Sequence, residues 1–98
     1  SAERLNTLYL ELDFQLEKAV EAYELAQNQI IVATKALEQA KENFRITKDQ
    51  FDANIANTSL MLDAQRFLAQ TQVNHYTAYF ALYDAMAEIE RVVEEEIF

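Results

Sequence analysis

Residues 51–65 read FDANIANTSLMLDAQ, and they interrupt a helical pattern that occupies the rest of the chain. The 98 residues include no Gly and no Pro. Asn is the non-glycine residue that best tolerates the left-handed backbone at a helix end, so we expect Asn54 to end a first helix. Asn57, Thr58 and Ser59 have side chains that can cap the start of a second helix. The stretch therefore predicts a turn at residues 54–57, and disfavours the alternative of one continuous helix.

Before and after this turn, residues recur at alternating spacings of four and three. The large members before it are Tyr9, Leu16, Tyr23, Ile30, Leu37, Phe44 and Phe51, and the mostly small members are Leu12, Ala19, Ala26, Ala33, Ala40 and Thr47. After the turn the large members are Met61, Leu68, His75, Leu82 and Ile89, and the small members are Ala64, Thr71, Ala78, Ala85 and Val92. This heptad pattern is typical of helices that pack along their length, and we call its members the large and small positions of the seam.

The two halves of the pattern match when the chain is folded back at residue 56. Large positions then face large positions, and the numbers of each pair add to 112, as for Phe44 with Leu68. Small positions face small positions, and their numbers add to 111, as for Ala40 with Thr71. We therefore predict an all-α fold in which residues 1–98 form one long antiparallel helical hairpin, a two-helix coiled coil. Its helices are expected at residues 3–53 and 58–95.

The second helix carries another apolar row, which we call the aromatic stripe: Val73, Tyr76, Phe80 and Tyr83. Two helices bury only one seam between them, and an apolar row outside that seam marks an interaction site. The stripe is thus a predicted oligomer face. The hairpin is expected to be one stave of a larger α-barrel or helical bundle.

Composition and charge exclude several classes of function. The chain has 8 Lys and Arg against 17 Asp and Glu, a net charge of −9, which opposes binding to nucleic acid. No apolar run approaches the length of a membrane span. Without Gly there can be no phosphate-binding glycine loop, and there is no Cys to serve as a nucleophile or ligand. The single histidine, His75, falls in the seam, so we predict no catalytic, metal-binding or cofactor-binding residues and no enzyme activity.

Residues around the turn follow a family pattern: an aromatic residue, two residues, Gly, an aliphatic residue, a small polar residue and a Leu-Asp-Ala-Gln-like run. Phe51, Ile55, Asn57 and residues 62–65 fit it. On these residues the stretch from Tyr23 to about Val93 resembles a periplasmic hairpin of the TolC-like outer-membrane efflux proteins. The sequence departs from the family where Asn54 replaces its tip Gly, and where Arg91-Val92-Val93-Glu94 replaces the Gly that often closes the returning helix. It also lacks the strands of the family's outer-membrane barrel.

This resemblance implies a role in conduction, for efflux or type I secretion, without chemistry. The family's subunits form trimers whose helical barrel crosses the periplasm of Gram-negative bacteria below the outer membrane. Hairpin tips there contact a periplasmic adaptor, the membrane fusion protein, which joins the channel to an inner-membrane pump. Carried over by position, the adaptor-contacting tip is Asn54, Ile55, Ala56 and Asn57.

Two alternatives stay open at this point. The chain is either a hairpin excised from a larger protein, most readily its C-terminal portion, or a free-standing relative. Its function, in turn, is either that of a channel component or that of a free-standing coiled-coil interaction or scaffold module that self-associates. The heptads alone support the second function, whereas the tip run and the aromatic stripe support the first.

Overall fold

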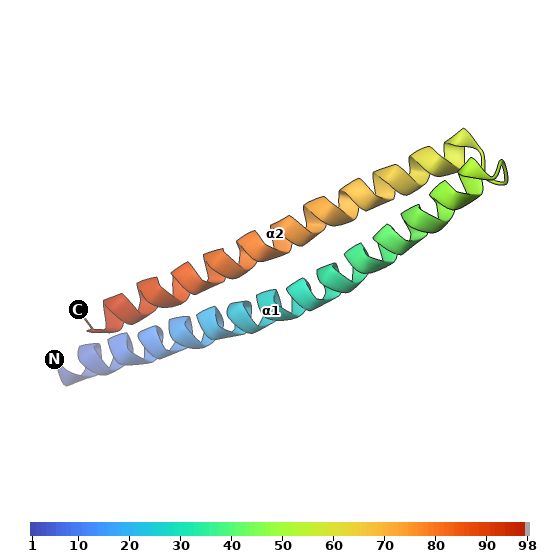
Figure 1. Ribbon diagram of the computed structural model, residues 1–98. Helices are drawn as coiled ribbons and strands as arrows, with labels where there is room; N and C mark the ends of the chain where they lie inside the picture. The colour runs from blue at the N-terminus through green and yellow to red at the C-terminus, as the bar shows by residue number, and fades with distance from the viewer. Residues whose placement is uncertain (98) are drawn as a thin grey trace. The chain divides into compact units, whose positions relative to one another are not determined.

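A computed structural model describes the backbone of residues 1–97 and the side chains of residues 1–95. The chain forms two helices, α1 (Ala2–Asp52) and α2 (Thr58–Ile97), and no strand is found among the residues described. A short turn joins the helices, and the chain reverses direction there (Figure 1). The predicted fold class, an all-α helical hairpin, is confirmed. Both helices begin within one residue of the predicted start, and α2 continues two residues beyond its predicted end.

The hairpin consists of two compact units, and each contains a segment of both helices. The turn unit is Gln29–Ala78, which includes the connection between α1 and α2. The terminal unit combines Ser1–Asn28 with the chain from Tyr79 onward. Within each unit the two helical segments pack along the seam that the heptad pattern predicts, as the burial of its small positions shows.

Small residues form the interior of both units. In the turn unit the buried small positions are Ala40, Ala64, Thr71 and Ala78; in the terminal unit they are Ala19, Ala26, Ala85 and Val92. Ala40 and Val92 have no exposed surface at all. Because Ala has a single methyl group, the helix backbones can approach closely, and the larger seam residues then lie at the edges of the interface. Those large positions are half-buried from Leu16 to Phe44 and from Met61 to Ile89.

The seam is shorter at both ends than the heptad pattern predicts. Tyr9 is 54% exposed and Phe51 is 37% exposed, although both occupy large positions. In the register that pairs numbers adding to 112, none of the α2 residues whose side chains are described lies opposite Tyr9. Every residue from Ser1 to Glu11 is accordingly exposed. Phe51 lies in the last turn of α1, where the helices separate into the connection.

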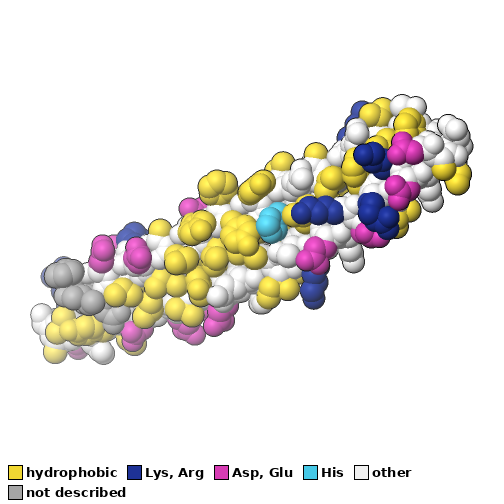
Figure 2. All heavy atoms as spheres, viewed as in Figure 1, with side chains coloured by type: hydrophobic (Ala, Val, Ile, Leu, Met, Phe, Trp, Pro, Cys, Tyr) yellow, Lys and Arg dark blue, Asp and Glu magenta, His cyan; other side chains and the backbone are white. Residues whose placement is uncertain are grey.

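Charge is divided unequally between the two units. The turn unit has five acidic residues and five Lys or Arg, whereas the terminal unit has twelve acidic residues and three Lys or Arg. The terminal unit therefore carries the whole net charge of −9. Lys and Arg side chains gather over the segments next to the turn on the face drawn in Figure 2. Over the described part of the chain, neither helix has a segment apolar enough to traverse a bilayer.

Candidate functional site

The turn is built by backbone hydrogen bonds that end α1. Asn54 adopts a positive φ of 61°, in the left-handed region. The Ile55 N–H donates to the Gln50 carbonyl at 2.7 Å, and the Asn54 N–H donates to the Phe51 carbonyl at 3.0 Å. These two bonds form a Schellman motif, which satisfies carbonyls that have no partner within the helix. The motif requires a left-handed residue at position 54, and without Gly in the chain Asn fulfils this requirement.

Asn57 begins α2 by capping it. Its side-chain Oδ1 accepts a hydrogen bond from the Leu60 N–H at 2.9 Å. Its backbone carbonyl accepts the first helical bond, from the Met61 N–H at 3.2 Å. Both contacts identify Asn57 as the N-cap, which satisfies one of the amides that a helix start leaves without a partner. The predicted capping role thus falls on Asn57, and Thr58 is the first residue of the helix.

The four predicted tip residues differ in how far their side chains are exposed to a partner. Asn54, Ile55 and Asn57 are exposed, and Ile55 is the most exposed large apolar residue described, at 76%. Ala56 is only 8% exposed, and its N–H donates to the Gln50 carbonyl at 3.1 Å. Its side chain therefore belongs to the packing of the turn. Among the four predicted tip residues, Ile55 is thus the one with an exposed apolar side chain.

A shallow groove lies beside the turn. It has a volume of about 330 Å³ and is lined by both helices of the turn unit, by Asn43, Thr47, Gln50, Leu60, Asp63, Ala64 and Phe67. The lining mixes amide, hydroxyl and apolar groups with a single carboxylate. Such a surface suits contact with another polypeptide better than capture of a small ligand, which needs an enclosed apolar cavity.

All four residues of the aromatic stripe are exposed on α2. Their exposed fractions run from 57% for Val73 to 69% for Phe80. Because they are spaced by three, four and three residues, they follow one face of the helix. The buried small position Ala78 lies on the opposite face. The aromatic stripe is thus outside the seam, as the sequence predicts, and large apolar side chains in this arrangement mark a surface for binding.

His75 lies half-buried at a large position of the seam in the turn unit. Its Nε2 is 3.2 Å from the Thr34 hydroxyl Oγ1 across the interface. The His75 ring also meets the Tyr76 ring edge to face, with centroids 6.2 Å apart. These contacts fit a packed polar side chain. Among the residues described, no three His, Cys, Asp or Glu side chains come together as a group that could hold a metal.

Two arginines form ion pairs with exposed carboxylates on their own helices. Arg45 pairs with Glu42 at 2.6 Å and with Asp49 at 3.2 Å, and Arg91 pairs with Glu88 and, at 2.6 Å, with Glu95. Hydrogen bonding and the positive charge of Arg45 lower the pKa of Glu42. Hydrogen bonding from Arg91 is likewise the main cause that lowers the pKa of Glu88. All of these groups are solvated, so the pairs adjust local helix stability and form no reactive centre.

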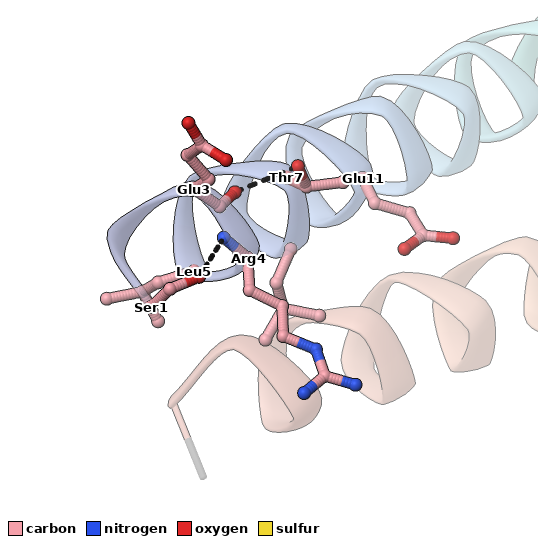
Figure 3. A pocket seen from close by; sticks show the side chains of 7 residues that line it. Ser1, Glu3, Arg4, Leu5, Thr7 and Glu11 are labelled. Atoms are coloured by element: carbon pink, nitrogen blue, oxygen red, sulfur yellow. Dashed lines mark hydrogen bonds between the residues drawn. The ribbon is translucent and has the colours of Figure 1, made fainter.

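An open hollow lies on the surface at the start of α1 (Figure 3). It is an open depression of about 810 Å³ whose lining comes only from the first three turns: Ser1, Glu3, Arg4, Leu5, Thr7, Leu8 and Glu11. Two local hydrogen bonds hold its rim, from the Arg4 N–H to Ser1 Oγ and from the Thr7 hydroxyl to the Glu3 carbonyl. Its side chains come from one helix and do not converge on a common point, so it has no features of a ligand site.

Sequence reasoning did not identify Thr34 as the partner of His75. It placed Leu37 opposite the histidine, and Thr34 is one helical turn before Leu37 on the same face. The sequence does contain a signal for this contact. Thr34 is polar and lies one turn from Leu37, the seam position predicted to face His75. The exposed apolar residues at the start of α1 were also not singled out; they include Leu5, Leu8, Leu10 and Phe14.

The site therefore consists of surfaces, with Ile55 exposed at the turn and the aromatic stripe along α2. Neither has the enclosed cavity or the converging polar groups of a catalytic centre. The chain was compared with protein-family models, with curated proteins and with solved structures, and nothing matches it in any of the three comparisons.

Proposed function

We propose that the chain is a periplasmic hairpin of a TolC-like outer-membrane channel for efflux or type I secretion. In this role the turn contacts a periplasmic adaptor linked to an inner-membrane pump, and the remaining residues are staves of an oligomeric helical barrel. The hairpin acts by shape and by surface contact.

The observation that carries this proposal is the backbone of Asn54. Its φ of 61° requires a residue that accepts the left-handed region, and the resemblance places Gly at this position. Asn54 can therefore occupy the left-handed position at which the family has Gly. The exposed Ile55 next to it fits the apolar residue expected at a docking tip, and the uncovered aromatic stripe fits the need of a stave for neighbours.

The direct test is made in the bacterium that carries the gene. Disrupting the gene should raise the cellular accumulation of a fluorescent efflux dye, and the wild-type gene should restore export. A gene encoding Ile55→Asp should fail to restore it, because a charge at the tip opposes apolar docking. The matched control is Gln39→Asp, at an exposed polar position outside the turn.

The outcomes of this test separate docking from folding. Equal export by the Ile55→Asp and wild-type proteins would contradict tip docking. Recovery of the protein outside the outer-membrane fraction, together with unchanged dye accumulation on disruption, would contradict the channel role altogether. Circular dichroism of both purified variants should show unchanged helix content, because both positions are exposed and outside the seam.

A second candidate function is a free-standing coiled-coil module that self-associates. The exposure of the aromatic stripe supports it as well as the channel role, because no described residue covers this apolar face. Sedimentation velocity should show oligomers of the wild-type chain that dissociate in the double variant Tyr76→Glu/Phe80→Glu. A monomeric wild-type chain at high protein concentration would contradict this candidate.

A further inference from the structure

We draw no further inference here: the strongest candidate, the exposed row of Val73, Tyr76, Phe80 and Tyr83 on α2 that forms the aromatic stripe, carries none because nothing in the structure shows what covers it.

Discussion

The hydroxyl oxygen Oγ1 of Thr34 lies 3.2 Å from Nε2 of His75, across the interface between α1 and α2 and 41 positions away in the chain. This hydrogen bond gives a polar side chain at a large seam position a partner from the opposite helix. The layers of buried Ala on either side allow the two helices to approach, and a histidine held in such a seam needs a polar contact.

Thr34→Val should lower the free energy of unfolding by about 1 kcal/mol, because it keeps the shape of the side chain and removes the hydroxyl that bonds His75. Urea unfolding followed by circular dichroism measures the change. Thr77→Val is the control, since Thr77 is exposed on α2 and the substitution is chemically identical. Equal stability of the two variants would show that the hydrogen bond contributes nothing.

Asn54→Ala should destabilise the hairpin by about 1–2 kcal/mol, since a residue with a Cβ is strained at positive φ and Asn tolerates that region better than Ala. Asn54→Gly should keep or raise the stability, because Gly enters the same region without strain. The two variants are compared with the wild type by urea unfolding. An Ala variant as stable as the Gly variant would mean that the turn has a different backbone in solution.

Asn57→Ala should lower the stability by about 1 kcal/mol, because it removes the side-chain acceptor for the Leu60 N–H. Asn57→Asp is the matched variant: it keeps an acceptor and adds a negative charge that the start of α2 favours. Its unfolding midpoint should equal or exceed that of the wild type. If Asn57→Asp lowered the stability as much as Asn57→Ala does, the result would be inconsistent with capping by the Asn57 side chain.

Ala40→Val should destabilise the turn unit by about 1–3 kcal/mol, because Ala40 is fully buried and the added methyl groups force the helices apart. Ala69→Val provides the comparison at an exposed position of the other helix, where only helix propensity changes. Thermal unfolding of both variants is measured by circular dichroism. Similar effects at the two positions would contradict the close packing of the seam.

The pH dependence of stability should reflect Glu42 and Glu88, whose pKa values are lowered from 4.5 by their arginine partners. A lowered folded-state pKa adds stability that is present above the unfolded value, and this stability is lost as the pH falls through the folded value. Arg91→Gln should raise the pKa of Glu88 and leave that of Glu42 unchanged, and Arg45→Gln should do the reverse.

Carboxylate titration by NMR measures both pKa values in each variant. The two substitutions serve as controls for one another, because Arg45 lies in the turn unit and Arg91 in the terminal unit. If either substitution changed the pKa values of both Glu42 and Glu88, the cause would be the net charge of the chain and not the local ion pairs.

The sequence by itself determined the fold class and the position of the turn, and it predicts a register for the seam. The heptad pattern runs from Tyr9 to Phe51 in α1 and from Met61 to Val92 in α2, and neither helix contains Gly or Pro, so local propensity and periodicity agree over most of both helices. Asn54 was suited to end the first helix, and Asn57 was one of the residues suited to cap the second. Periodicity also left the aromatic stripe outside the seam, because it assigns each residue to a face of its helix.

Only the tertiary structure decided which side chains have partners across the interface. Thr34 meets His75, Ala56 is buried within the turn, and Tyr9 remains exposed despite its seam position. Heptad spacing assigns a face of the helix to each residue. It does not specify the distance between the helices, the path of the backbone through the turn, or the length over which α2 packs against α1. Those quantities arise from packing between distant segments, and they set which predicted contacts are made.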